Sequence, residues 1–219
     1  GEQRTMQQAL SPDGRTIVFA RGETLLVLDA ETGLPRLAGI DLGKSSIGVL
    51  FQDPTSFCVA TGDDVARYDL ATGQVIERTL TGAKCCGFAL SPRGQIACLE
   101  NEGELRRWPS ASAAQLASIS LPHSPIVGMG YCDRGNLLAI ACQDGIVRLM
   151  DPDSGTCLLR LRIATPVMSF RAHPTLPRIG WVSRGEPAAV LDLHTLDVPL
   201  AAHRAYFEAV SIKEDTAGR

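Results

Sequence analysis

The sequence lacks the features that mark membrane proteins and nucleic-acid-binding proteins. No apolar run reaches the roughly 18 residues that a membrane-spanning helix needs. Basic residues are not in excess, because 21 Lys and Arg stand against 24 Asp and Glu, for a net charge of −3. A surface that binds phosphates needs such an excess. We therefore expect no membrane and no nucleic acid among the partners of this chain.

Motifs that carry catalysis or hold a cofactor are also missing. No Gly-rich phosphate loop, nucleophile elbow or zinc-protease motif occurs. Zinc sites need clustered ligands, but the four histidines lie in different segments with no pair at metal-ligand spacing. They are His123, His173, His194 and His203. We expect no catalytic residue, no metal site and no cofactor, and we expect that the chain is not an enzyme.

The seven cysteines indicate a reducing compartment. Most lie in apolar strand-like runs, where a free cysteine behaves as a small buried hydrophobe. An odd number at irregular spacing does not fit a disulfide framework. The start of the chain, Gly1-Glu2-Gln3-Arg4, shows no signal peptide. The expected location is cytoplasmic.

What the sequence does contain is an internal repeat. The turn Ser11-Pro12-Asp13-Gly14 has four related copies, and the first residues of successive turns lie 41, 39, 41 and 40 positions apart. The later copies begin at Gln52, Ser91, Cys132 and Ala172. A second marker keeps the same spacing, because an aspartate closes an apolar run at Asp29, Asp69, Asp151 and Asp192. A period near 40 residues indicates a propeller or a solenoid.

Each repeat divides into four short strands separated by turns. In the first repeat we expect strands at residues 6–10, 16–20, 24–29 and 36–42. Their β-branched and aromatic residues favour strands, and no segment shows sustained helical periodicity. Four strands in about 40 residues match one propeller blade, so we predict an all-β fold, a β-propeller of about five four-stranded blades. The five repeats span about 5–43, 44–82, 83–122, 123–163 and 164–204.

The last residues leave open how such a ring closes. Residues 205–219 are expected to form the start of a sixth repeat or a closing strand. Three alternatives follow: a five-bladed ring that closes unaided, a part of a larger propeller, or pairing with another chain. Repeat arrays need their ends covered, which favours an incomplete propeller or a part of a larger one. Open sheet edges make a homo-oligomer a further expectation.

The repeats resemble the blades of WD-repeat β-propellers, in the degenerate form of the bacterial kind. The resemblance covers essentially all of residues 5–212 and rests on the Ser-Pro-Asp-Gly turn, the strand-end aspartates, Asp144-Gly145, Thr32-Gly33 and Thr72-Gly73. The Trp of the family's Trp-Asp ending is present only as Trp108, which Pro109 follows, and the Gly-His pair is missing. The family's His–Asp–Ser/Thr–Trp network is therefore not expected in most blades, and hydrophobic packing must hold them.

Two sets of residues are candidates for a site. Arg67, Arg106, Arg107 and Arg148 lie on the predicted third strands of three consecutive repeats. They are either ordinary solvated arginines or a basic stripe that binds an acidic segment of a partner. Cys85 and Cys86 lie on the predicted innermost strand of the third repeat, one toward the channel and one into the packing between blades. Their alternatives are buried thiols or a redox role, which needs an exposed and electropositive setting.

The resemblance implies a binding function. Loops at the ends of the channel carry recognition in WD-repeat proteins, and the blades act as a scaffold. We therefore expect a non-enzymatic protein-interaction, scaffold or sensor domain within a larger multidomain protein, whose partner is another protein or another domain of the same protein. The alternative is a small-ligand-binding propeller, or a hydrolase or lactonase, acting in the central channel. An enzyme would bring titratable groups together there, whereas a binding domain presents a patch on an end face.

Overall fold

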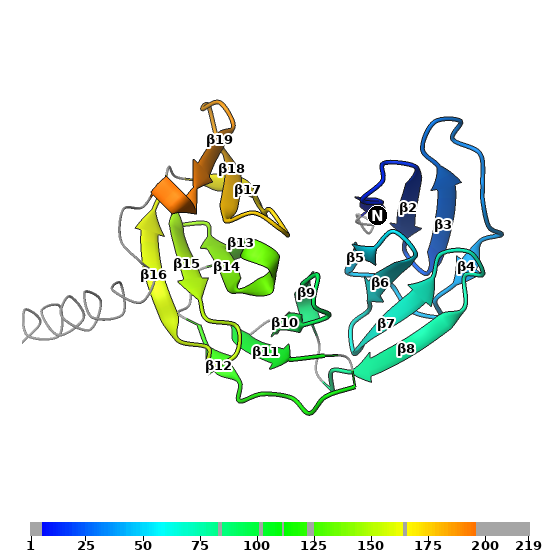
Figure 1. Cartoon of the computed structure of the whole chain (residues 1–219), viewed down its shortest axis with the longest axis horizontal. Coiled ribbons are helices and arrows are strands. Elements are labelled where there is room, and N and C mark those ends of the chain that lie inside the picture. The colour runs from blue at the N-terminus through cyan, green and yellow to red at the C-terminus, as the bar shows by residue number, and fades with distance from the viewer. Residues whose placement is uncertain are drawn as a thin grey trace, which may run out of the picture. The chain divides into compact units, whose positions relative to one another are not determined.

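Five consecutive antiparallel sheets make up the computed structural model of the chain (Figure 1). It describes residues 6–82, 85–100, 103–110, 112–121, 125–163 and 166–195. The chain divides into two compact units, of which Gly1–His123 contains three sheets and Ser124–Arg219 contains two. Each sheet is built from one uninterrupted stretch of chain whose strands pair in sequence order. This is the sheet of a propeller blade.

The described residues of the first unit form twelve strands in three sheets. The first sheet comprises β1 (Met6–Leu10), β2 (Thr16–Arg21), β3 (Thr24–Asp29) and β4 (Ile40–Asp41). The second comprises β5 (Gly48–Asp53), β6 (Ser56–Ala60), β7 (Asp64–Asp69) and β8 (Val75–Leu80). The third comprises β9 (Cys85–Leu90), β10 (Ile96–Glu100), β11 (Glu104–Trp108) and β12 (Ile119–Ser120).

The second unit contains the other two sheets. The fourth sheet comprises β13 (Ile126–Cys132), β14 (Leu137–Cys142), β15 (Ile146–Met150) and β16 (Cys157–Arg162), with the short helix η1 (Asp133–Gly135) after β13. The fifth comprises β17 (Val167–Ala172), β18 (Arg178–Ser183) and β19 (Ala189–Asp192), which the helix η2 (Leu193–Thr195) follows. The expected closing segment, residues 205–219, lies outside the described residues.

The prediction of an all-β fold made of repeated four-stranded sheets is confirmed, and most strand bounds differ from the expected ones by one or two residues. The first repeat's outer strand is an exception, because β4 covers only two residues of the expected 36–42. Leu28 and Pro35 form an isolated bridge instead. Glycine weakens a strand interior, and Gly39 lies inside the interrupted segment.

Neighbouring sheets of each unit approach one another through their first strands. β1 contacts β5 and β5 contacts β9 in the first unit, and β13 contacts β17 in the second. The approach needs glycine at Gly48, where a β-carbon would lie 2.4 Å from the Phe88 ring. At Gly130 a β-carbon would lie 3.0 Å from the β-carbon of Ala172. A glycine inside a strand commonly marks a place where another segment of the chain approaches closely.

Apolar side chains fill the space between successive sheets. Val18, Phe57 and Tyr68 belong to the core that joins the first and second sheets. Leu149 and Phe170 belong to the core that joins the fourth and fifth. Hydrophobic packing holds these sheets together, as the incomplete Trp-Asp and Gly-His pattern led us to expect.

The aspartate that recurs at the ends of third strands caps the turn that follows it. Asp29 accepts a hydrogen bond from the Thr32 N–H at 2.9 Å, and Asp69 accepts one from the Thr72 N–H at 2.8 Å. The ion pair with Arg36 holds the pKa of Asp29 far below its ordinary value, and the Thr72 hydroxyl lowers the pKa of Asp69. The aspartates therefore recur in the sequence, at least in the first two repeats, because each one caps the turn after the third strand.

Candidate binding pocket between the second and third sheets

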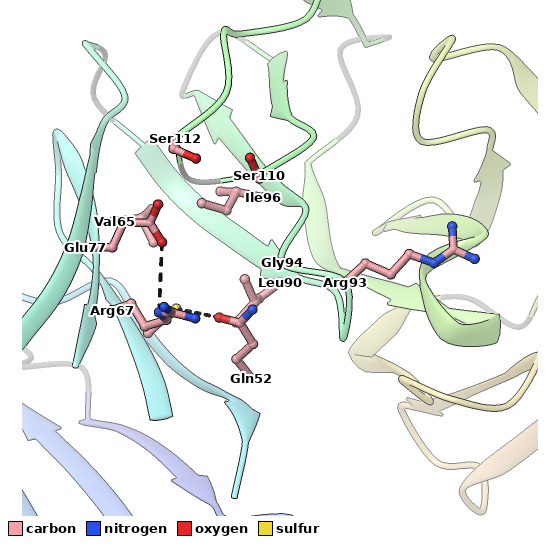
Figure 2. Close-up of a pocket in the computed structure, with 11 residues that line it drawn as sticks. Gln52, Val65, Arg67, Glu77, Leu90, Arg93, Gly94, Ile96, Ser110 and Ser112 are labelled. Carbon is pink, nitrogen blue, oxygen red and sulfur yellow. Dashed lines mark hydrogen bonds and ion pairs between the residues drawn. The ribbon is translucent and has the colours of Figure 1, made fainter. Parts of the chain in front are cut away.

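A pocket of about 180 Å³ lies in the first unit, between the second and third sheets (Figure 2). The second sheet contributes Gln52, Cys58, Val65, Arg67 and Glu77. The third sheet and its loops contribute Leu90, Arg93, Gly94, Ile96, Ser110 and Ser112. Arg93 lines the pocket with the part of the residue nearest the backbone, while its guanidinium points away from the other side chains (Figure 2). Charged and hydroxyl groups therefore stand beside apolar walls.

Strand alternation explains why these residues meet. Successive side chains of a strand point to opposite faces of its sheet. On β7, Ala66 and Tyr68 join the core toward the first sheet, so Val65 and Arg67 point toward the third. On β6, Cys58 shares the face of Arg67 because the two residues are register partners. One face of the second sheet thus packs an apolar core, and the other lines the pocket.

Arg67 and Glu77 are the charged pair of the pocket. They are register partners on β7 and β8, and Arg67 Nε lies 3.9 Å from Glu77 Oε2. This distance is too long for a hydrogen bond. Within the described part of the chain, the buried Nε of Arg67 has no hydrogen-bond partner. The side chains of Arg67 and Glu77 are 30% and 31% exposed, so a donor and an acceptor are both within reach of an incoming group.

Cys58 and Gln52 also line the pocket. The Cys58 Sγ lies 4.0 Å from Gln52 Oε1. Burial raises the pKa of the Cys58 thiol to about 12, so the group is protonated at neutral pH and is not a nucleophile. The Gln52 amide lies close to Gly94, where a β-carbon would stand 3.0 Å from Gln52 Nε2. Gly94 also has φ +83°, which favours glycine.

Ser110 and Ser112 come from a turn that departs from the repeat. Where the first and second repeats have a capping aspartate and a Thr-Gly pair, this repeat has Trp108, Pro109 and a serine-containing loop. Sequence analysis noted that Pro109 follows Trp108 but did not predict the pocket. The sequence signal that could have indicated the pocket is the loss of the capping aspartate at Trp108, combined with the hydroxyl groups of Ser110 and Ser112 close to arginines on the strand before them.

The four arginines that the sequence singled out lie in different environments. Arg107 is 2% exposed and donates a hydrogen bond to the Ala117 carbonyl at 2.9 Å. Arg148, in the second unit, is 6% exposed and donates to Cys142 Sγ at 3.0 Å. Burial removes these two from any exposed surface. Arg67 and Arg106 point into the space between the second and third sheets, each paired with a glutamate. Partner binding by any of the four stays a prediction.

Cys85 and Cys86, the expected redox candidates, differ in exposure. Cys86 is exposed, whereas Cys85 is 4% exposed and belongs to the core between the second and third sheets. Cys98 and Cys58 belong to the same core. Sequence reasoning did not connect Cys85 with Cys98, which lies on the neighbouring strand. The structure brings together Cys85 and Cys98 rather than Cys85 and Cys86.

Other candidate chemistry is sparse. His173 accepts hydrogen bonds through Nδ1 from the N–H groups of Leu176 and Thr175, so it caps a turn. His123 and His203 lie outside the described residues. Among the residues that are described, no three His, Cys, Asp or Glu side chains cluster as a metal site would require. No helix within them has the length and hydropathy to span a membrane.

Comparison with known proteins supports the assignment of the fold. No protein-family model matches the chain. A solved structure, the β-propeller domain of Cps50 (Swd1) from Myceliophteria thermophila, matches with a TM-score of 0.69 at 15% sequence identity. The match covers 89% of this chain and 68% of that one. Together with the repeated sheets, this likeness shows that the chain has a β-propeller fold, as the sequence predicted.

Proposed function

We propose that this chain is a non-enzymatic interaction propeller of the WD-repeat kind, and that the pocket between the second and third sheets receives a side chain of a protein partner. The observation that carries the proposal is the size of the pocket. Sites for small-molecule substrates usually measure about 300–1,000 Å³. This pocket, at about 180 Å³, has room for roughly six waters of about 30 Å³ each. That space suits one side chain better than a whole substrate.

The polar groups of the pocket define the kind of side chain. Arg67 donates hydrogen bonds, Glu77 accepts them, and the hydroxyls of Ser110 and Ser112 can do either. A carboxylate that approached Arg67 would also meet the like charge of Glu77. An amide of asparagine or glutamine can accept from Arg67 and donate to Glu77 at once. The chemistry therefore supports an amide side chain in an extended segment of the partner.

The alternative function, catalysis or small-ligand binding in the channel, receives less support. The pocket thiol of Cys58 stays protonated because burial raises its pKa to about 12. An arginine does not lose its proton in proteins, so Arg67 cannot serve as a general base. This leaves Glu77 as the one carboxylate among the residues that line the pocket, and it pairs with Arg67 rather than with a second acid or base.

The test is a comparative capture with two matched variants. Arg67→Met keeps an unbranched apolar side chain in place of the arginine stem and removes the charge and the hydrogen-bond donors. Arg160→Met makes the same change on β16, where Arg160 is exposed. Native chain and both variants are used as bait in a native lysate, and the captured proteins are quantified by mass spectrometry. We expect a set of proteins held by the native chain and by Arg160→Met but lost from Arg67→Met.

A second measurement links capture to the pocket. Overlapping synthetic peptides that cover the sequence of a captured protein are prepared. The Kd of each peptide for each of the three baits is measured by calorimetry. We expect a peptide with an asparagine or glutamine whose Kd rises about tenfold or more with Arg67→Met, the loss of a charge-assisted hydrogen bond. Identical capture by all three baits would overturn the proposal. A set lost equally from both variants would also count against it.

A second copy of the chain is the alternative partner, through the open sheet edges expected from the sequence. Light scattering after size-exclusion chromatography of the purified protein decides this point. A stable dimer would support edge pairing, whereas a monomer over a tenfold range of concentration would leave a different protein as the partner. The role of the domain within a larger multidomain protein is part of the same proposal.

A further inference from the structure

The register of β9 and β10 places Cys85 and Cys98 on one face of the third sheet. Cys98 pairs with Phe88 and Leu99 pairs with Gly87, but Glu100 pairs with Cys85. Cys86 is therefore the extra residue of a β-bulge. Cys98 and Glu100 share a face because they are two residues apart on β10. Cys85, opposite Glu100, shares that face with Cys98. Without the bulge, strict alternation would have put Cys85 on the other face.

The two thiols are in contact. Cys85 and Cys98 are hydrogen-bonded to one another. Both belong to the core between the second and third sheets, with 4% and 0% of their surfaces exposed. Cys86, the residue next to Cys85, is exposed and lies outside that core. Both sulfurs are buried, so a small oxidant reaches Cys85 when the end of β9, where this residue lies, opens locally.

We propose that Cys85 and Cys98 are a redox modification site, where a peroxide converts the two thiols into a reversible disulfide. The proposal concerns a different site from the pocket of Arg67 and does not depend on partner binding. Both sites lie in the space between the second and third sheets, because Ile96 and Cys58 belong to the core of the thiol pair and also line the pocket.

The thiol pair is arranged so that one sulfur is the nucleophile. The hydrogen bond from Cys98 lowers the pKa of Cys85, and the same contact raises the pKa of Cys98. Of the two, Cys85 is therefore the thiol that ionises first, and the thiolate is the reactive form. Other buried thiols differ in this respect, because desolvation raises the pKa of Cys58 and of Cys132 to about 12. The contact with Cys98 distinguishes Cys85 from them.

The reaction balances as two steps. The Cys85 thiolate attacks one oxygen of hydrogen peroxide, the O–O bond breaks, and a sulfenic acid forms. The other oxygen leaves as hydroxide, which takes up the proton that Cys85 had released and becomes water. The Cys98 sulfur then attacks the Cys85 sulfur, the S–O bond breaks, and a second water leaves with the proton of Cys98. The two thiols lose two electrons and two protons, and the peroxide is reduced to two waters. A dithiol reductant reverses the change.

The covalent bond requires a local movement. Hydrogen-bonded sulfurs must close to the S–S length of about 2.05 Å. Cys85 is the first residue of β9, so the shift affects one end of a strand and not its centre. The bulge adds a residue at the same end, and bulges already disrupt the local ladder of hydrogen bonds.

The experiment maps the bond in the full chain. Native protein is treated with hydrogen peroxide at neutral pH, remaining thiols are blocked with N-ethylmaleimide, and non-reduced tryptic peptides are analysed by mass spectrometry. Cleavage at Lys84, Arg93 and Arg106 separates the Cys85-Cys86 peptide from the Cys98 peptide. We expect a linked pair of these peptides about 2 Da lighter than their sum, which dithiothreitol returns to the free thiols.

Three variants assign the bond. Cys86→Ser should keep the link, because Cys86 lies outside the core. Cys98→Ala should lower the linked fraction at least about tenfold and leave Cys85 to oxidise further to the sulfinic acid, because its resolving thiol is gone. Cys85→Ser should abolish the link. Circular dichroism before treatment confirms that each variant is folded.

Two results would overturn the proposal. One is the absence of a Cys85–Cys98 link at peroxide concentrations that oxidise exposed Cys86 in the folded native protein. The other is a link that persists in Cys85→Ser and disappears in Cys86→Ser, which would assign the reaction to the exposed thiol. Because Cys86→Ser changes an exposed side chain, its folding does not limit the test even if a core variant fails to fold.

Discussion

The two spaces between sheets in the first unit are built from opposite faces of the same second sheet, yet their chemistry differs. Toward the first sheet lie Phe57 and Tyr68, whose rings stack with centroids 5.4 Å apart and an interplanar angle of 5°. Toward the third sheet lie Cys58 and Arg67. Each strand alternates between the two environments one residue at a time. A single sheet thus separates an aromatic core from a polar, thiol-containing one.

We infer from this difference that one space mainly stabilises the fold and that the other mainly provides reactive and binding groups. The aromatic core is apolar and well packed, and close-packed cores respond strongly to the loss of volume. The space toward the third sheet contains two arginine–glutamate pairs, a pocket and three thiols. Some of the buried polar atoms there, such as Arg67 Nε, have no hydrogen-bond partner among the described residues. We therefore expect this space to contribute less to stability and to be better suited to binding a ligand or reacting with an oxidant. Four substitutions or conditions test that division.

The largest effect is expected from Phe57→Ala in the aromatic core. Phe57 is fully buried and stacks on Tyr68, so its removal leaves a cavity and deletes a ring contact. We expect the free energy of unfolding to fall by about 3–5 kcal/mol, measured by urea denaturation with fluorescence and circular dichroism. Leu80→Ala is the matched control, because Leu80 is 73% exposed, and it should change stability by less than about 0.5 kcal/mol. Equal losses from both variants would contradict the division.

A smaller loss is expected from Glu100→Gln on the opposite side of the second sheet. Glu100 forms an ion pair with Arg106, and the two side chains are 18% and 26% exposed. Removing one charge leaves the other partly buried, so we expect a loss of about 1–3 kcal/mol, less than for a fully buried pair. Arg106→Met should cost a similar amount.

The double variant shows whether the ion pair is the cause. Glu100→Gln combined with Arg106→Met should lose less than the sum of the single variants, with a coupling of about 1 kcal/mol. The same denaturation experiment gives all three values. Strictly additive losses would mean that the two charges act independently, and the ion pair would then make no contribution of its own to the stability of the third sheet.

Alkaline pH should weaken the thiol-containing space through Cys58. Burial raises the pKa of Cys58 from 9.0 to about 12, so the folded state holds this proton more tightly than the unfolded state. The stabilisation is fully present below pH 9.0 and is lost as the pH rises toward 12. Between pH 9 and 10 we expect a loss of about 1 kcal/mol. Cys58→Ala should remove this part of the dependence of the unfolding free energy on pH. Denaturation curves recorded under reductant at each pH measure that dependence. Parallel slopes for native protein and variant would contradict the assignment.

Most of the fold followed from local sequence signals. The spacing of Ser11-Pro12-Asp13-Gly14 and of Asp29 and Asp69 predicted the repeat, because turn residues have a physical role that does not depend on the rest of the fold. Asp29 and Asp69 do cap their turns. The short β4 was missed because pairing of an outer strand depends on its neighbour and not on its own residues.

The site followed much less from the sequence. Arg67 was singled out by its repeat position, but the burial of Arg107 was not foreseen, because neighbouring strand residues face opposite sides and periodicity alone does not say which side is covered. The contact of Cys85 with Cys98 depends on a β-bulge that reverses the alternation at Cys86. A bulge is a tertiary feature without a fixed sequence signature here, so the thiol pair required the structure.

The smallest effect on stability is expected from Arg67→Met, the substitution that should matter most for binding. Arg67 and Glu77 are about one-third exposed and 3.9 Å apart, and pairs of this kind contribute about 0–1 kcal/mol. The methionine keeps the aliphatic stem that packs beside Cys58, so the unfolding free energy should change by less than about 1 kcal/mol. Denaturation curves and partner capture on the same preparation separate the two properties. A loss as large as that of Phe57→Ala would make Arg67 part of the structural core, whereas lost capture at unchanged stability assigns it to recognition.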